Sequence, residues 1–242
     1  MCKKYKENKM KAKFDGYASK YDQWFMENEN MYLTELNVVE MALKSVNTEK
    51  SLSVGCGSGL FEVSLKDRGI TITDGLEPSE DMAAIAEKRG LNVIIGIIED
   101  AKLEEEYYDS IYLNGSSTYI EDLESAYKTV YKALKPGGHI VVIDVPKESS
   151  FGILYQFAAY AKTFDLPNFE GILPKSPYPI ELVTNTVMTT TPEKRDILEK
   201  VGFKNFKFYQ TLTTDPSYSD CYVEEAVEGY DKGSYVAIVG EK

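Results

Sequence analysis

Three glycines at alternate positions, Gly55, Gly57 and Gly59, follow a short predicted strand at 51–54 and open a predicted helix at 59–68. Glycine permits backbone angles closed to other residues and carries no Cβ atom that would hold a ligand away from the main chain. The amides at the start of the helix favour a negatively charged group such as a carboxylate. The segment is typical of a loop for a nucleotide-type ligand, although similar turns also occur where a helix only packs closely on a strand.

An acidic residue at a suitable distance favours the ligand-binding interpretation. The run at 70–76 is a second predicted strand, and Glu77 follows it, 22 residues after Gly55 (77 − 55). In doubly wound α/β folds, an acid about 20 residues after the first glycine binds the ribose hydroxyls of an adenosyl ligand. The alternative for Glu77 is a solvated loop carboxylate, which the pairing of the two motifs disfavours.

Strands and helices must alternate to place these two loops side by side. The predicted strands cover 51–54, 70–76, 92–97, 109–113 and 139–145, and the predicted helices between them cover 59–68, 79–89 and 122–134. A later helix begins at 191 and ends at Gly202, and two last strands cover 204–212 and 234–240. This order predicts an α/β fold with a doubly wound, seven-stranded, mostly parallel sheet.

The length of 242 residues is near the upper size of one ordinary domain, so we expect a single domain over 1–242. Its first part is an N-terminal helical cap at 1–47, followed by a ligand-binding core at 48–145. An aromatic insertion occupies 146–190 after the fifth strand, and the last helix and strands occupy 191–242.

The charge of the chain disfavours some classes of partner. A formal net charge of −12 repels phosphate backbones and anionic membrane surfaces. No stretch is long and apolar enough for stable membrane insertion, and the three cysteines are too widely spaced for a disulfide framework. We expect no nucleic-acid partner, a cytoplasmic location, and a monomer or homodimer.

Four short motifs occur in a fixed order: VGCGSG at 54–59, LEPSEDM at 76–82, IEDA at 98–101 and LKPGG at 134–138. In this order they resemble the class I S-adenosylmethionine-dependent methyltransferases, especially the small-molecule group that includes the ubiquinone and menaquinone biosynthesis enzymes. The resemblance implies a Rossmann-like fold, S-adenosylmethionine as cofactor, S-adenosylhomocysteine as product, and no metal. It covers roughly residues 14–145 and then the last helix and strands.

The resemblance also implies which residues contact the cofactor. The glycines would line its methionine and ribose parts, Glu77 would bind the ribose, and Met82 would pack on the adenine. Asp100 would bind the adenine amino group, and Asn114 would lie beneath the sulfonium. The full implied set is Tyr17, Tyr21, Gly55, Cys56, Gly57, Gly59, Glu77, Pro78, Met82, Glu99, Asp100, Ala101, Asn114 and Gly115. The segment 14–22, with Tyr17 and Tyr21, would close over the cofactor.

Two positions depart from the family pattern. Ser53 stands where many relatives carry an acid that helps hold the methionine part of the cofactor, so the anchoring of its amino group is open. Thr118 stands in the segment where relatives often carry a histidine, so we assign no histidine base. These departures keep a second reading open, namely a cofactor-binding regulatory or assembly subunit with little turnover. A nicotinamide dehydrogenase is disfavoured because Gly59 comes one residue too early for G-x-G-x-x-G.

The expected chemistry needs few catalytic side chains. Methyl transfer from a sulfonium is an in-line displacement with an excellent leaving group, so alignment and exclusion of water supply much of the acceleration. The only histidine, His139, begins the fifth strand, whereas ligands bind beyond the carboxyl ends of such strands, so we expect a structural role for it. The catalytic residue stays unknown, with Asp144, Tyr17 and Tyr21 as candidates.

The acceptor site is expected under the aromatic insertion. The predicted acceptor contacts are Tyr119, Phe151, Tyr155 and Tyr160. An insertion that roofs the pocket with such side chains would select a small organic acceptor that is apolar or aromatic. The same aromatic stripe is also compatible with a plain core helix or a dimer contact.

Overall fold

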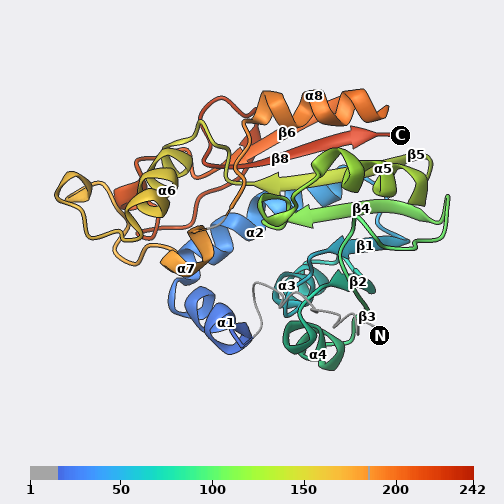
Figure 1. Ribbon diagram of the computed structural model, residues 1–242, viewed down its shortest axis with the longest axis horizontal. Coiled ribbons are helices and arrows are strands. Elements are labelled where there is room, and N and C mark those ends of the chain that lie inside the picture. Colours follow the sequence, from blue (N-terminus) through green and yellow to red (C-terminus); the bar gives the residue numbers. More distant parts are fainter. Residues whose placement is uncertain (1–15, 185) are drawn as a thin grey trace, which may run out of the picture.

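A mixed β-sheet forms the centre of the molecule in the computed structural model, which describes residues 16–184 and 186–242 (Figure 1). In the described residues the sheet has eight strands in the order β3-β2-β1-β4-β5-β8-β6-β7. The strands are β1 (Ser51–Val54), β2 (Asp74–Glu77), β3 (Asn92–Ile95), β4 (Tyr108–Asn114), β5 (Leu134–Asp144), β6 (Lys204–Thr211), β7 (Val227–Glu228) and β8 (Tyr235–Glu241).

Strands β1 to β5 pair in parallel, whereas β8 runs antiparallel to both of its neighbours, β5 and β6. The predicted α/β fold with a mostly parallel sheet is therefore confirmed. The expected count of seven strands omitted β7, a two-residue strand at the edge of the sheet, paired with β6. Two residues are too few to give an alternating pattern in the sequence.

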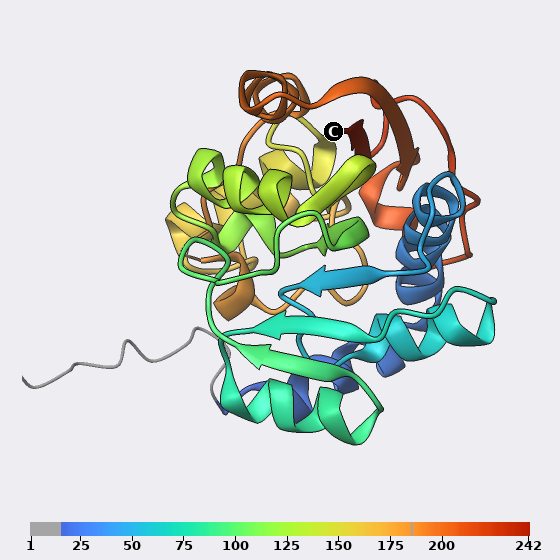
Figure 2. The ribbon, with the colours of Figure 1, turned by 90° about the vertical axis from the view of Figure 1, so that its right-hand side faces the viewer.

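Helices cover both faces of the sheet (Figure 2). One face packs against α2 (Glu29–Lys44) and α3 (Leu60–Asp67), and the other against α5 (Leu123–Ala133) and α8 (Thr191–Val201). Strand β5 shows the alternation: Val141 and Ile143 face the first pair of helices, whereas Ile140 and Val142 face the second. Successive side chains on a strand point to opposite faces, so a strand between two helical layers is apolar throughout.

Local capping fixes where the functional loops begin. Helix α4 (Glu80–Lys88) starts at Ser79, whose hydroxyl accepts a hydrogen bond from the Met82 amide. Helix α8 starts with a capping box between Thr190 and Glu193 and ends at Gly202, whose φ is +124°. Because α4 begins immediately after β2, the side chains of its first turn lie at the carboxyl end of the sheet.

The remaining helices gather at that same end. The arrows of β4 and β5 in Figure 1 point toward α6 (Ser150–Ala161) and α7 (Ile180–Val183), with α1 (Ala18–Glu27) below them. Three short 3₁₀ segments, η1 (Ser117–Tyr119), η2 (Pro167–Phe169) and η3 (Pro216–Tyr218), lie in the connections. Within the described residues, no helix has the length and apolar character needed to cross a membrane.

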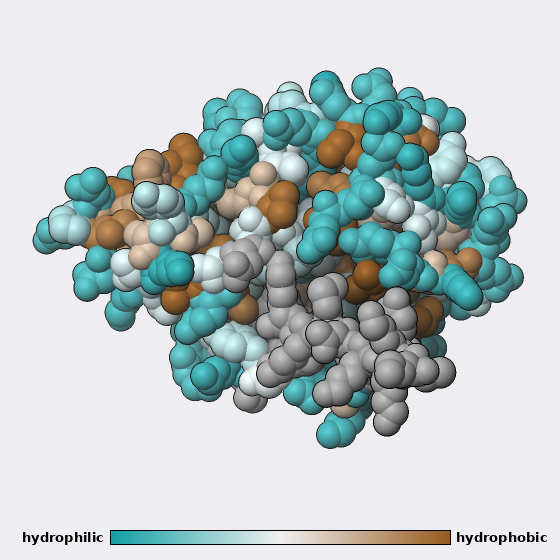
Figure 3. Space-filling view, in the orientation of Figure 1, coloured by the Kyte–Doolittle hydropathy of each residue, from teal (hydrophilic) through white to brown (hydrophobic). Residues whose placement is uncertain are grey.

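Helix α6 leaves apolar side chains at the surface. Ile153, Phe157 and Tyr160 are 47%, 59% and 91% exposed, respectively. Hydrophobic residues are visible at the surface on the left of Figure 3, the end of the molecule where α6 lies. The opposite face of α6 carries Phe151 and Leu154, which are buried. Only one face of this helix therefore belongs to the interior.

Candidate functional site

A cavity of about 220 Å³ opens at the carboxyl ends of the central strands, where the strand order reverses between β1 and β4. This is the place where open α/β sheets bind their ligands. Its wall has two parts with different chemistry. The glycine side comprises Gly55, Gly57, Glu77, Pro78, Met82 and Glu99. The tyrosine side comprises Tyr21, Glu35, Tyr119, Tyr155, Tyr178 and Tyr235.

The glycine loop presents bare main chain to the cavity. Gly57 has a φ of +55°, and a Cβ atom added there would meet no atom within 4 Å. Gly55 also has a positive φ, and an added Cβ would lie 2.5 Å from the Cβ of Ser116. Gly59 plays a different part, because it contacts Ala86 and not the cavity. The first two glycines therefore shape the wall, whereas the third lets α3 pack near α4.

Glu77 joins the second strand to the glycine loop. Its carboxylate accepts hydrogen bonds from the backbone amides of Gly57 at 2.9 Å and Ser79 at 2.8 Å. The side chain is 4% exposed and lines the cavity. Main-chain amides thus hold the charged carboxylate in place beside the loop.

The neighbouring wall is mainly apolar. Met82 is 1% exposed and lines the cavity together with Pro78 and the side chain of Glu99. Asp100 and Ala101, which the motif predicted as contacts, are not part of the wall. The structure therefore brings only the first acid of the IEDA motif to the cavity.

Helix α1 covers the glycine loop. Asp22 accepts a hydrogen bond from Ser58 Oγ at 2.5 Å and pairs with Arg89 at 2.6 Å, while the Gly16 amide donates to Asp81. These contacts place Tyr21 on the cavity wall, whereas Tyr17 lies outside it. Partial burial, followed by the charge of Glu181, raises the pKa of Tyr17. Positions 14 and 15 of the predicted closing segment lie outside the described residues.

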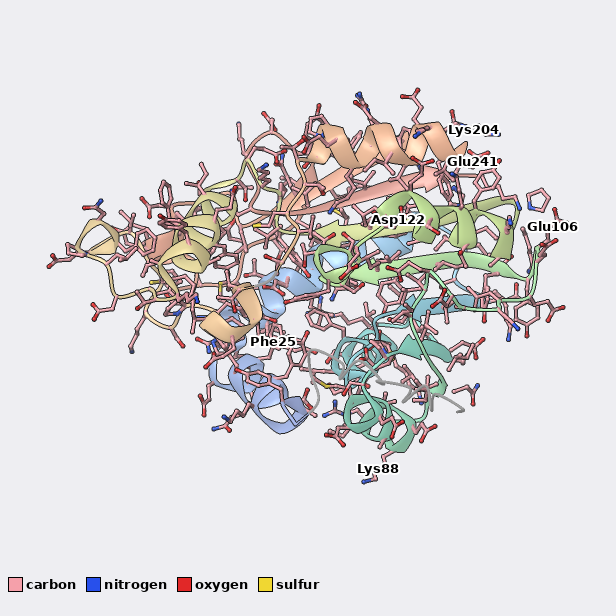
Figure 4. All side chains as sticks on the ribbon, in the orientation of Figure 1. Phe25, Lys88, Glu106, Asp122, Lys204 and Glu241 are labelled. Carbon is pink, nitrogen blue, oxygen red and sulfur yellow. The ribbon has the colours of Figure 1, made fainter. Side chains whose placement is uncertain are left out.

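Phe25 anchors the same helix to the interior. It projects inward from α1, whereas Lys88 on α4 points into solvent (Figure 4). Its ring packs edge to face on Phe61 at 5.5 Å and on Tyr32 at 5.6 Å between centroids. Phe25 also lines the cavity. The aromatic contacts hold α1 against α2 and α3.

The floor of the cavity lies at the end of β4. Asn114 and Gly115 both line it, and Asn114 Oδ1 accepts a hydrogen bond from the Tyr235 hydroxyl at 2.8 Å. The Gly115 amide donates to the carbonyl of Ile143 at 2.8 Å. The floor is therefore fixed to the neighbouring strand β5 through backbone and to β8, the next strand along, through a side chain.

These features are those of a family that the comparisons identify. A solved structure from Thermotoga maritima, described as an S-adenosylmethionine-dependent methyltransferase and possible histamine N-methyltransferase, is 32% identical, with a TM-score of 0.78. The match covers 95% of this chain and 98% of that one. This chain belongs to the S-adenosylmethionine-dependent methyltransferases. The predicted family and cofactor are thereby confirmed.

Other relatives of this methyltransferase agree. A methyltransferase domain model matches residues 52–142. An uncharacterized protein of Methanocaldococcus jannaschii is 30% identical over 95% of this chain and 98% of its own length. A ubiquinone biosynthesis O-methyltransferase of Alkalilimnicola ehrlichii is 27% identical over 59% of this chain and 63% of its own length. The relatives establish the family and leave the acceptor open.

A second, smaller hollow adjoins the glycine loop. It is lined by Ser53, Gly55 and Glu62, with Tyr21 and Asn114 nearby on its wall. Glu62, from α3, is 4% exposed and accepts a hydrogen bond from the Tyr112 hydroxyl. Its Oε2 atom has no hydrogen-bond partner among the described residues. Sequence reasoning missed Glu62, because only the packing of α3 on the sheet brings it beside Ser53.

Burial raises the pKa of Glu62, whereas the nearby Ser53 and Tyr112 hydroxyls favour its charged form and lower it. A buried carboxylate with an open oxygen, in a hollow that shares the bare main chain of Gly55 with the main cavity, fits a ligand that carries both an adenosyl group and an ammonium group. Among the described residues, no group of three or more potential ligand side chains is placed to hold a metal ion.

Asp144, the candidate on the fifth strand, lies on the cavity wall in an ion pair. Its Oδ2 atom is 2.6 Å from Lys194 Nζ and also accepts a hydrogen bond from the Ser117 hydroxyl. Its Oδ1 atom is buried without a hydrogen-bond partner among the described residues. Both charges are buried, so Lys194 neutralises Asp144 where water cannot. Lys194 comes from α8, and no motif or spacing in the sequence predicted that it would pair with Asp144.

The predicted acceptor residues fall into different places. Tyr119 and Tyr155 line the cavity, and the Tyr119 hydroxyl donates to the Leu182 carbonyl at 2.8 Å. Phe151 is buried behind Tyr155, with ring centroids 5.7 Å apart, and does not reach the cavity. Tyr160 is exposed on the outer face of α6 and also lies away from the cavity. Phe151 shares a face of α6 with Tyr155 but lies one turn before it, whereas Tyr160 lies on the opposite face, toward solvent.

Cys56 and His139 also lie outside the main cavity. Cys56 contributes only to the small hollow, and a Cβ atom added at Gly75 would lie 2.7 Å from its sulfur. Burial raises the pKa of the Cys56 thiol, which keeps it protonated. His139 pairs with Ser110 and Glu241 in the middle of β5, which begins at Leu134 and not at His139 as expected. Neither residue touches the cavity in which transfer would take place.

Proposed function

We propose that this methyltransferase transfers a methyl group from S-adenosylmethionine to a small organic acceptor with an apolar or aromatic body. The observation that carries this proposal is the tyrosine side of the cavity. Rings from α1, α6, β8 and the segment before α7 face one space beside the floor residue Asn114. Flat apolar walls with a few polar tips are typical of sites for small aromatic ligands.

We further propose where the cofactor binds. The bare main chain at Gly55 and Gly57 would contact its ribose and methionine parts, and Glu77 would exchange its amide partners for the ribose hydroxyls. Met82 would pack on the adenine. Glu62 would bind the ammonium group of the methionine part in place of the acid missing at position 53. Each assignment follows from the position of the side chain on the cavity wall or in the small hollow.

The cofactor supplies an electrophilic methyl group on a sulfonium. The chain contributes alignment: Asn114 and Gly115 form a fixed floor, and α1 covers the glycine loop through Asp22. The aromatic wall would reduce the access of water when cofactor and acceptor fill the cavity, which strengthens the electrostatic interactions inside. Orientation of this kind supplies a large part of the acceleration of a bimolecular displacement.

The proposal is tested in two steps with the full chain. Calorimetry with S-adenosylhomocysteine measures cofactor binding, and mass spectrometry of a panel of small aromatic acceptors measures transfer. The Tyr155→Arg variant places a charged side chain in the aromatic wall and should abolish transfer while cofactor binding persists. Tyr160→Arg, on the exposed face of the same helix, is the matched control. Cofactor binding without turnover on any acceptor would favour the regulatory-subunit reading instead.

A further inference from the structure

We propose that the acceptor is a basic amine, and that Glu35 binds its ammonium group within a ring of tyrosines. The inference rests on the proposed function and specifies its acceptor. Glu35 comes from α2 and lies half-buried on the tyrosine side of the cavity. No motif contains it, and the resemblance assigns it no role.

The ring around Glu35 is built from four separate elements. Tyr21 comes from α1, Tyr155 from α6, Tyr178 from the segment before α7, and Tyr235 from β8, and each of them interacts electrostatically with Glu35. Tyr155 and Tyr178 stack with centroids 6.5 Å apart and an interplanar angle of 29°. Aromatic faces attract cations, and the attraction is strongest where water is excluded.

Glu35 has no compensating charge of its own. None of the described residues forms a hydrogen bond or an ion pair with its carboxylate, and no lysine, arginine or histidine contributes to its electrostatic surroundings. Asp144, on the same wall, is paired with Lys194 at 2.6 Å. A charged carboxylate that lies among aromatic rings and has no ion-pair partner is unfavourable unless a ligand supplies a cation. Glu35 therefore matches an ammonium group, whereas Asp144 does not.

Burial among these rings raises the pKa of Glu35 to about 8. The groups that face it are the four tyrosines, whose own pKa values burial raises above the usual range, so they stay neutral. Near neutral pH the carboxyl is mostly protonated, and an arriving ammonium group favours the carboxylate. Amine binding should therefore release a proton from Glu35 and should strengthen as the pH rises toward 8.

The same carboxylate can take part in transfer. A bound ammonium group must lose one proton before its nitrogen can attack, and Glu35 accepts that proton. The nitrogen lone pair then forms the bond to the methyl carbon while the S–C bond breaks and its electron pair returns to sulfur. The positive charge of the sulfonium thus passes to the methylated amine. The proton on Glu35 leaves to solvent when the product departs.

The test uses calorimetry on the chain saturated with S-adenosylhomocysteine. The probes are the amines phenethylamine, tryptamine and histamine. The control is 2-phenylethanol, an uncharged analogue of phenethylamine in which a hydroxyl replaces the amine. We expect at least one amine to bind, and phenethylamine to bind at least about tenfold more tightly than the alcohol. Glu35→Gln should remove this preference and leave S-adenosylhomocysteine affinity unchanged. Glu181→Gln, the same change at an exposed position outside the cavity wall, should keep it.

A second readout separates binding from simple structural damage. Titrations at pH 7 in phosphate and in Tris, which differ in ionisation enthalpy, count the protons released. The unmodified chain should release close to one proton per amine, and Glu35→Gln should release none. Failure of all three amines to bind, or an amine preference that survives Glu35→Gln, would overturn the inference. A Glu35→Gln variant that loses affinity for S-adenosylhomocysteine but keeps its affinity for the amine would also overturn the inference. A chain that does not bind S-adenosylhomocysteine at all would overturn the proposed function itself.

Discussion

The two sides of the cavity are built in different ways. The glycine side comes from loops that directly follow β1, β2 and β3, and its polar groups are main-chain amides and one buried carboxylate, Glu77. The tyrosine side takes side chains from α1, α2, η1, α6 and β8, which are far apart in the sequence. Backbone atoms suit a ligand shared by a whole family, whereas side chains from many elements can change with the acceptor.

The carboxylates of the two sides also differ. On the glycine side, Glu77 is satisfied by the amides of Gly57 and Ser79. Elsewhere on the cavity wall, Asp144 has Lys194, whereas Glu35 on the tyrosine side has no partner among the described residues. Hydrogen bonds from main-chain amides stabilise the charged form of Glu77. No group of the described residues does so for Glu35, so a bound ligand would have to supply the cation. A polar group without a partner is therefore the clearest sign of what the acceptor brings.

The role of main chain on the glycine side is tested most strongly by Gly57→Val. A branched side chain would fill the space next to the loop, so S-adenosylhomocysteine affinity should fall at least about 100-fold. Gly69→Val is the control, because Gly69 also has a positive φ and no atom near an added Cβ, but lies outside the cavity. Calorimetry should show a loss for the first variant alone, while both lose similar thermal stability.

Glu77→Ala removes the carboxylate of the glycine side. We expect cofactor affinity to fall by about 1–3 kcal/mol, because charge-assisted hydrogen bonds to the ribose are lost. The exposed neighbour Glu80 provides the control variant Glu80→Ala. Titration with S-adenosylhomocysteine measures both. An unchanged affinity for Glu77→Ala would show that the ribose binds elsewhere.

Glu62→Gln tests whether the small hollow holds the ammonium group of the cofactor. S-adenosylhomocysteine affinity should fall by about 1–2 kcal/mol, because one charge-assisted hydrogen bond becomes neutral. The affinity for 5′-methylthioadenosine, which lacks the amino-acid part, should not change. Adding Ser53→Asp should restore part of the loss by returning the acid to its usual position. An equal loss for both ligands would contradict this assignment.

Glu35→Gln tests the unpaired carboxylate of the tyrosine side through stability. The folded-state pKa of Glu35, about 8, lies above its unfolded value, so folding favours the protonated form. The unmodified chain should therefore lose stability as the pH rises from about 4.5 through 8. After allowance for partial exposure, Glu35→Gln should be more stable by about 1–2 kcal/mol at pH 9 and nearly unchanged at pH 5. Urea unfolding of both chains at the two pH values measures this difference.

His139→Gln should have the smallest effect. His139 lies in the middle of β5, five residues before Asp144 at its carboxyl end, and does not touch the cavity. Turnover should stay within about twofold of the unmodified chain. Steady-state kinetics on any accepted amine provides the measurement. A collapse of the rate in a variant that still folds would contradict the structural role assigned to His139.

The glycine side could be predicted from sequence in large part. Gly55, Gly57, Glu77 and Met82 all reach the cavity wall, because each lies within a few residues of the end of a strand. Such positions follow from local chain direction, since all parallel strands end at the same edge of the sheet. Cys56, Gly59, Asp100 and Ala101 were predicted with them and lie off the wall of the main cavity. Neighbours in a loop can face opposite ways, and the spacing of a motif does not show which.

The tyrosine side could be predicted only in part. Tyr119 and Tyr155 reach the wall, but Phe151 and Tyr160 on the same insertion do not. Glu35 was not predicted at all, and Tyr178 lies within the insertion that was expected to roof the pocket but was not among the named contacts, although both line the cavity. They belong to no motif, and one is an ordinary acid on an amphipathic helix. Their meeting depends on how α2 and the insertion pack across the end of the sheet.

The sequence by itself determined the order of strands and helices, the parallel sheet and the loops that follow β1 and β2. These features depend on hydrophobic period, glycine angles and caps, which act over a few residues. Only the tertiary structure decided that Lys194 neutralises Asp144, that Glu62 lies beside Ser53, and that four tyrosines share a cavity wall with Glu35. Such groups meet after the chain has closed loops of tens of residues, and packing of whole elements, which no local pattern records, sets their positions.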